Sequence, residues 1–259
     1  MKRFLSVLAP LAIVVILAAV AAAQDSKDKA PPSKDKTEPA PAKEKSDKDK
    51  ADQDKSDKPA EKAKSDKEAA PAAKSAGTEA LKETPYYPLQ VGNRWDYRLG
   101  DNRYSMRVAK HEKVGNYMCA RVEMMVDDKV TAHEHIAVTS EGVVRVAYDD
   151  RLSEPPLLFL KLPPAKDQTW KVDSVIGKTE KSPGEKVSGS FKQGEVAKVS
   201  EPAGMFENVI TCNSPDLDAN GLKLSFTYYF AKGTGMVKQE IDVGGQKVII
   251  DLEKFEQGK

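Results

Sequence analysis

Large apolar residues are missing from a long stretch of this sequence, and their absence limits where a folded core can form. Residues 24–84 are dominated by Lys, Asp, Glu, Ala, Ser and Pro, with Leu81 as the only large aliphatic residue. Such a segment cannot bury enough apolar surface to offset the conformational entropy that folding costs. With one exception near the N-terminus, aromatic residues appear only from Tyr86 onward. The sequence therefore predicts a disordered linker over residues 24–84 and one folded domain over residues 85–259.

Residues 1–23 form an apolar segment with a basic start, which is typical of a signal peptide. Lys2 and Arg3 precede the apolar run Phe4–Val20, and three alanines before Gln24 provide a small-residue cleavage site. An uncleaved membrane anchor is the alternative, because about 20 apolar residues are just enough to span a bilayer. In both cases we expect an exported protein, which is periplasmic, extracellular or membrane-anchored facing outward. It would contact a membrane only if the segment stays uncleaved.

The charges of the chain are balanced and evenly mixed. The sequence has 41 Lys plus Arg and 40 Asp plus Glu, and in the expected linker lysines and acidic residues alternate closely in equal numbers. No segment gathers the positive charge that holds nucleic acid, so we expect no nucleic-acid partner. As a flexible coil, the linker would have an end-to-end distance of roughly 40 to 45 Å, which would hold the domain away from a surface.

From Tyr86 onward apolar and polar side chains alternate, and turn residues interrupt the alternation. Trp95, Tyr97 and Leu99 alternate in this way before a turn at Gly100. No stretch has the apolar stripe of an amphipathic helix. The pattern predicts a mainly β domain, an antiparallel meander that forms a strongly curved sheet or open barrel. The expected strands span residues 95–99, 104–108, 118–126, 132–139, 143–148, 169–176, 186–200, 206–212, 223–230, 235–243 and 247–255.

The domain also carries several aromatic and glycine-containing motifs. They are Tyr86-Tyr87-Pro88-Leu89, Gly92-Asn93, Trp95-Asp96-Tyr97, Gly204-Met205-Phe206-Glu207-Asn208-Val209, Tyr228-Tyr229-Phe230-Ala231 and Gly233-Thr234-Gly235-Met236-Val237-Lys238. Together they resemble a widespread group of uncharacterised exported bacterial β domains. The resemblance covers most of residues 86–255, and it implies no known activity and no assigned catalytic residues. It also suggests kinship in shape with lipoprotein carriers of half-barrel form. Members of the group commonly have a Pro-Gly pair where this chain has Lys232-Gly233.

The three histidines are the first candidates for a metal site. His133 and His135 are two apart, so on a strand they would point to one face and could bind zinc, with His111 as a third ligand. The alternative is a solvated face, because Ala132 and Ile136 occupy the core-facing positions and turn both histidines toward solvent.

A second metal candidate is a calcium loop. Asp216, Asp218, Asn220 and Gly221 reproduce the opening of such a loop, although Thr227 stands where the last acidic ligand is expected. The competing interpretation is a tight β-hairpin, which an Asn-Gly pair strongly favours. Apart from these zinc and calcium candidates, the sequence predicts no cofactor.

Cys119 and Cys212 lie on strand-like segments of an exported chain, where a disulfide is permitted. A bridge between them would close a long loop and stabilise the domain by several kcal/mol. Two isolated buried thiols explain the sequence equally well.

Several large side chains could line a cavity if the sheet encloses one. A simple filled core is the alternative. The apolar run at residues 157–162, bracketed by proline pairs, reads as a buried strand or as a strap across one end of the sheet. The candidates for the cavity wall are Trp95, Tyr97, Phe159, Phe226 and Tyr228.

These features favour a non-catalytic envelope module on a tether, acting by binding or by structural contact. We expect no catalytic residues, and its partner would be an envelope component or a small apolar ligand. A half-barrel carrier of a lipid or small apolar ligand is the alternative. A metal-dependent enzyme using His133 and His135 is a weaker one.

Overall fold

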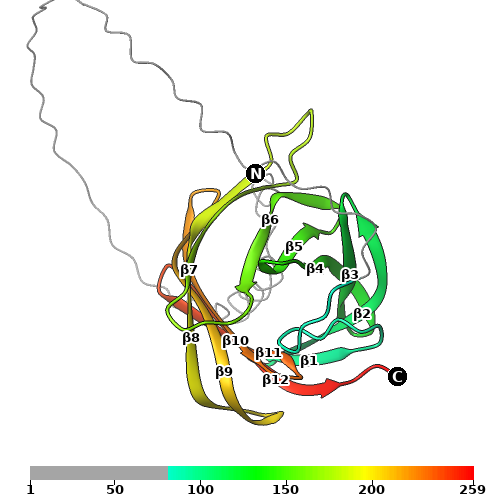
Figure 1. Cartoon of the computed structure of the whole chain (residues 1–259), viewed down its shortest axis with the longest axis vertical. Helices are drawn as coiled ribbons and strands as arrows, with labels where there is room; N and C mark the ends of the chain where they lie inside the picture. Colours follow the sequence, from blue (N-terminus) through cyan, green and yellow to red (C-terminus); the bar gives the residue numbers. More distant parts are fainter. Residues whose placement is uncertain (1–80) are drawn as a thin grey trace, which may run out of the picture.

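The computed structural model describes residues 81–259, which form a closed barrel of antiparallel strands (Figure 1). The predicted signal peptide or anchor, and the predicted linker up to residue 80, lie outside the described residues. Within residues 81–259 no helix is long and apolar enough to cross a membrane. The strands are β1 (Arg94–Leu99), β2 (Asn102–Val114), β3 (Tyr117–Val126), β4 (Lys129–Val138), β5 (Gly142–Tyr148), β6 (Arg151–Lys161), β7 (Thr169–Ile176), β8 (Glu185–Glu201), β9 (Gly204–Ala219), β10 (Leu222–Ala231), β11 (Gly235–Val243) and β12 (Gln246–Glu256).

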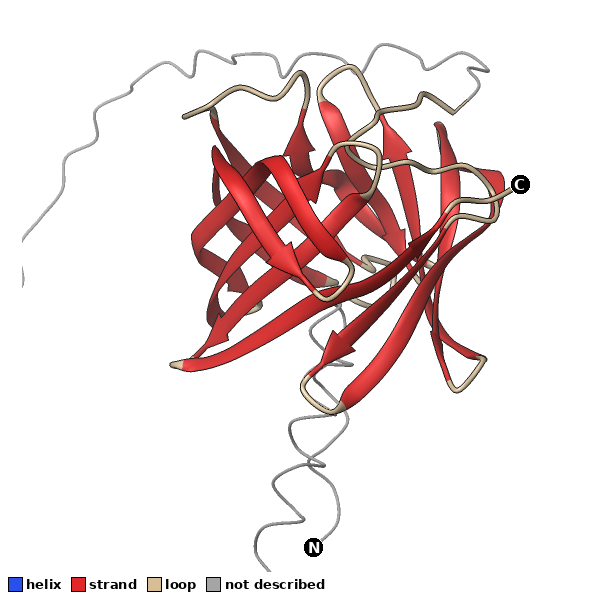
Figure 2. Ribbon diagram, turned by 90° about the horizontal axis from the view of Figure 1, so that it is seen from below, coloured by secondary structure: helices blue, strands red, loops and turns tan. Residues whose placement is uncertain are grey.

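The predicted meander is confirmed, and it closes rather than staying open. Each strand pairs with its sequence neighbours, and β1 also pairs with β12 over the register Arg94–Leu99 with Glu256–Ile250. Figure 2 shows strands all around the wall and no helix in the described part. Closure leaves no unpaired edge strand, which is how a barrel avoids pairing with other chains.

Alternation along the strands places one face of the sheet inside the barrel. In β1, Trp95 and Tyr97 are each only 2 % exposed, while the intervening polar residues are half-buried on the outer side. Every strand contributes to the main hydrophobic core, and Met124, Ala132 and Tyr148 form a smaller cluster of their own. The chain before β1 adds Tyr87 and Leu89 to this core, and Leu81 packs against it. Packed structure therefore reaches back into the last residues of the predicted linker.

Strand β6 includes most of the apolar run at residues 157–162, for which the sequence left a buried strand and a strap as alternatives. Its Pro155-Pro156 pair suggested a boundary, because proline has no N–H group to donate to a neighbouring strand. In the structure residues 157–162 are the buried second half of β6 and the residue after it, rather than a separate strap.

The prolines are accommodated because the ladder between β6 and β7 is short. Only two residue pairs join these strands in register, Ser153 with Ile176 and Glu154 with Val175. Beyond them side chains replace the ladder: Ser174 Oγ donates to Pro155 O at 2.7 Å and Trp170 Nε1 donates to Leu158 O at 2.9 Å. By contrast, β7 pairs with β8 along its whole length. We call this short ladder with its two side-chain bonds the β6–β7 seam.

The combined change of Trp170 to Phe and Ser174 to Ala should loosen the seam. Each change removes a partly buried hydrogen bond to a β6 carbonyl, which costs about 0.5 to 1.5 kcal/mol. Amide hydrogen exchange of β6 and β7 should therefore speed up, while β2 and β3 stay protected.

Trp95→Phe is the matched control, because Trp95 Nε1 donates to Thr234 O at 2.6 Å in a strand with full ladders on both sides. If the control accelerated exchange in β6 and β7 as much as the seam variant does, the seam would not be a weak point of the wall.

Candidate functional site

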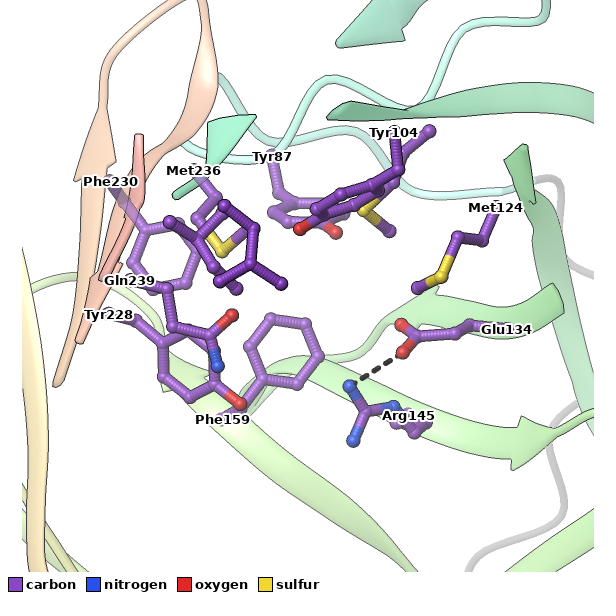
Figure 3. Close-up of a pocket in the computed structure, with 13 residues that line it drawn as sticks. Tyr87, Tyr104, Met124, Glu134, Arg145, Phe159, Tyr228, Phe230, Met236 and Gln239 are labelled. Carbon is purple, nitrogen blue, oxygen red and sulfur yellow. Dashed lines mark ion pairs between the residues drawn. The ribbon is translucent and has the colours of Figure 1, made fainter. Parts of the chain in front are cut away.

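A small cavity inside the barrel combines aromatic, thioether and charged side chains (Figure 3). Its volume is about 40 Å³. On the usual scale of about 10 to 15 Å³ for one water, it holds roughly three. Its walls come from the segment before β1 and from most of the strands. The lining residues are Tyr87, Leu99, Tyr104, Met106, Met124, Glu134, Arg145, Phe159, Tyr228, Phe230, Met236, Gln239 and Ile250.

An ion pair between Glu134 and Arg145 is the main polar feature of the cavity. Arg145 Nη2 lies 2.8 Å from Glu134 Oε1, and the two side chains are only 8 % and 6 % exposed. The Arg145 Nε atom is buried and has no hydrogen-bond partner in the described structure. Burial acts to lower the pKa of the Arg145 guanidinium, but the charge of Glu134 outweighs it and the pKa is raised. Arg145 is therefore a fixed cation in the barrel, with one donor free.

Strand alternation places both charged residues inside. On β4, Glu134 lies between Ala132 and Ile136, which face the interior. On β5, Arg145 has the same parity as Val143, which belongs to the interior core. Sequence reasoning missed this pair, although a Glu between two core-facing residues was a signal for it.

Three tyrosines face the ion pair from other parts of the barrel. Burial raises the pKa values of Tyr87, Tyr104 and Tyr228, and the negative charge of Glu134 adds to each increase. For Tyr228 the nearby Arg145 partly offsets the increase. All three rings therefore carry neutral hydroxyl groups, which can donate and accept hydrogen bonds.

Of the predicted cavity residues, Phe159 and Tyr228 line the cavity, and Trp95, Tyr97 and Phe226 do not. The last three belong to the surrounding core. Trp95 Nε1 donates to Thr234 O at 2.6 Å, and Tyr97 Oη donates to Met236 O at 2.8 Å. These bonds fix both rings as packing elements beside the cavity.

The expectation that His133 and His135 point into solvent is wrong, since they are 9 % and 5 % exposed. Their parity is opposite to that of Glu134, as expected, but each is enclosed by neighbours. His135 Nε2 lies 3.0 Å from Glu112 Oε1, and His133 Nδ1 lies 3.4 Å from Asp149 Oδ1. The two rings also pack edge to face, with centroids 5.2 Å apart.

His111 has a different environment, because its Nε2 lies 2.7 Å from Leu89 O. Within residues 81–259, no group of three or more His, Cys, Asp or Glu side chains is arranged to hold a metal ion. The structure therefore does not bring the three histidines together as zinc ligands.

The Asn220-Gly221 pair forms the tight turn between β9 and β10. Asn220 and Gly221 have φ values of 53° and 89°, as a hairpin turn of this kind requires. Asp218 Oδ1 accepts a hydrogen bond from Gly221 N at 2.7 Å, and Asp218 also pairs with Lys223 at 3.0 Å. Asp216 instead accepts a hydrogen bond from Ser190 Oγ at 3.3 Å. Of the predicted calcium ligands, Asp218 is thus engaged within the hairpin and Asp216 is engaged with β8.

Cys119 and Cys212 are both buried and free. Cys212 belongs to the interior core, whereas Cys119 lies in a separate cluster with Ala137, Val144 and Val146. Of the two alternatives left open by the sequence, the structure has the two isolated thiols. Burial raises the pKa of each thiol to about 12, which makes both poor nucleophiles.

No protein-family model and no curated protein matches this chain. Two solved structures have similar folds, each with 12 % sequence identity and covering 66 % of this chain. One is assigned as a lipoprotein from Parabacteroides distasonis ATCC 8503, with 98 % of that chain covered and a TM-score of 0.37. The other is assigned as an exported protein with a YmcC-like fold from Bacteroides fragilis NCTC 9343, with 99 % covered and a TM-score of 0.35. At such TM-scores neither likeness carries an argument about function.

Proposed function

We propose that this chain is an exported, tethered β-barrel module that binds a small molecule inside its barrel. The basic and then apolar N-terminal segment supports export. The charged, Pro-containing segment that follows supports a tether. The function is binding rather than catalysis, with the barrel interior as the binding site.

The observation that carries this proposal is the Glu134–Arg145 pair inside a cavity whose other lining residues are uncharged and mostly apolar or aromatic. Burying two charges costs more than packing apolar residues of the same size, so such a pair contributes little to stability. Binding sites, by contrast, combine apolar walls with a few polar groups that orient a ligand. The pair and the adjacent free volume fit that description.

The cavity size favours a small ligand over a lipid. Pockets for drug-sized ligands measure about 300 to 1,000 Å³, and this cavity measures about 40 Å³. Met106, Met124 and Met236 line it, and unbranched methionine side chains adapt readily to a ligand. A molecule of a few heavy atoms fits directly, and methionine rearrangement would admit about one ring.

Native mass spectrometry of the full chain purified from its own host tests the proposal. We expect a small bound mass that Leu99→Phe removes, because Leu99 lines the cavity and a larger ring fills it. Leu152→Phe is the control, since Leu152 is 40 % exposed outside the cavity. A bound mass that survives Leu99→Phe as well as it survives Leu152→Phe would place the ligand elsewhere and defeat the proposal.

A further inference from the structure

We infer that the ligand is an uncharged molecule whose polar group accepts a hydrogen bond from Arg145 Nε. This inference rests on the proposed function and names the chemistry of the same site. Three features of the cavity lead to it: its charge balance, its unpartnered donor and its size.

The cavity is electrically balanced before a ligand enters. Glu134 and Arg145 contribute one negative and one positive charge at 2.8 Å. Tyr87, Tyr104 and Tyr228 stay neutral, because their pKa values are raised. A charged ligand would add an uncompensated charge to a site with little access to water, and that is strongly unfavourable. The charge balance thus favours a neutral ligand.

The polar atom without a partner is a donor. Arg145 Nε is buried without a hydrogen-bond partner, whereas one terminal nitrogen of the same guanidinium binds Glu134. A buried donor without an acceptor carries a free-energy cost that a suitable acceptor removes. An oxygen of a hydroxyl, carbonyl or amide group supplies that acceptor without adding a charge. Gln239, which is 4 % exposed, also lines the cavity and carries both a donor and an acceptor.

The rest of the ligand has to be apolar and compact. Phe159, Phe230 and Ile250 form apolar parts of the wall. Aromatic side chains pack well against another ring in offset or edge-to-face geometry. Because the cavity measures about 40 Å³, a single ring is the largest body that modest movement of the lining methionines would admit. The ligand class is therefore a small neutral alcohol, amide or carbonyl compound with at most one ring.

Four probes that share one fluorinated ring test this assignment by fluorine NMR on the full chain. They are 4-fluorobenzyl alcohol, 4-fluorobenzoate, 4-fluorobenzylammonium and 4-fluorotoluene. The alcohol should bind tightest, and the anion and the cation should bind weaker by about tenfold or more. The toluene should also bind weaker than the alcohol, because it leaves the Arg145 donor unsatisfied.

The combined change of Glu134 to Leu and Arg145 to Met removes both charges and fills the same space with apolar side chains. This variant should lose the preference for the alcohol over the toluene. The matched control combines Arg103→Met with Glu253→Leu, since Arg103 Nε lies 2.8 Å from Glu253 Oε2 in an exposed Arg–Glu pair. The control should keep the wild-type order of affinities.

The outcomes separate this inference from the proposed function. Tightest binding by the anion or the cation, or equal binding by all four probes, would overturn the inference and leave small-molecule binding intact. If no probe bound at millimolar concentration, the inference would fail, and the native mass spectrometry described above would still decide the proposed function. A preference for the alcohol that the double variant retained would place recognition away from Arg145 and overturn the inference.

Discussion

Replacing Arg145 with methionine should lower the free energy of unfolding by about 3 to 5 kcal/mol, because it leaves the Glu134 carboxylate buried without its partner. The loss should be measured by urea unfolding of the full chain, followed by tryptophan fluorescence. In contrast, the combined change of Glu134 to Leu and Arg145 to Met should have a stability close to that of the wild type. Replacing a buried ion pair by apolar residues of similar volume is often neutral or stabilising.

The comparison with an exposed pair shows whether burial is the cause. Arg103 pairs with Glu253 through two hydrogen bonds, but its side chain is 67 % exposed. Arg103→Met should therefore cost less than about 1 kcal/mol. An Arg145→Met variant that was no less stable than Arg103→Met would mean that the interior pair is not held apart from water.

The stability of the domain should fall between about pH 4.5 and about pH 7 because of Glu201. The Glu201 side chain is only 2 % exposed and lies 3.6 Å from Lys238 Nζ. Burial and the nearby Asp251 carboxylate raise the pKa of Glu201 to about 7, and Lys238 partly offsets the increase. Asp251 and Lys238 are the charged groups next to Glu201. Lys238 also pairs with Glu240, and Asp251 pairs with Arg98.

The sign of the effect follows from proton binding. In the folded state Glu201 holds its proton up to about pH 7, whereas its ordinary pKa is 4.5. Its contribution to stability is therefore fully present below about pH 4.5 and is lost as the pH rises through about 7. The loss amounts to at most about 3.5 kcal/mol, since each pKa unit corresponds to about 1.4 kcal/mol.

Glu201→Gln should remove this pH dependence, because glutamine cannot ionise. The variant should match the wild type near about pH 4.5 and exceed its stability near about pH 8. Glu207→Gln is the control, since Glu207 pairs with Lys198 at an exposed site. Parallel stability curves for wild type and Glu201→Gln in urea unfolding across this range would rule out Glu201 as the source.

Much of the wall could be predicted from the sequence, because alternation and turn residues are local signals. The expected strands at residues 169–176 and 235–243 have the bounds of β7 and β11. For β6 the sequence predicted a strand or a strap over residues 157–162, and the first half of the strand was missed because Pro155 and Pro156 usually end strands. They are tolerated here because β7 needs no N–H donor from them at the seam.

The candidate site was less accessible to sequence reasoning. The alternation that placed Ala132 and Ile136 in the core also pointed Glu134 inward, so one half of the ion pair had a local signal. The size of the cavity and the identity of its other lining residues had no local signal in the sequence. They depend on how barrel closure brings Tyr87, Phe159 and Tyr228 together from distant parts of the chain. The burial of His133 and His135 likewise depends on partners from other strands.

The pairing of the first strand with the last also affects how the domain is made. During synthesis β1 emerges early, but its second neighbour β12 comes at the very end of the domain. Until then one side of β1 has no partner, and bare strands of this kind readily join other molecules. Arg94, Asp96 and Arg98 alternate with the buried residues of β1 and give its outer side a row of charges. These charges disfavour association with other chains until β12 is synthesised and closes the barrel.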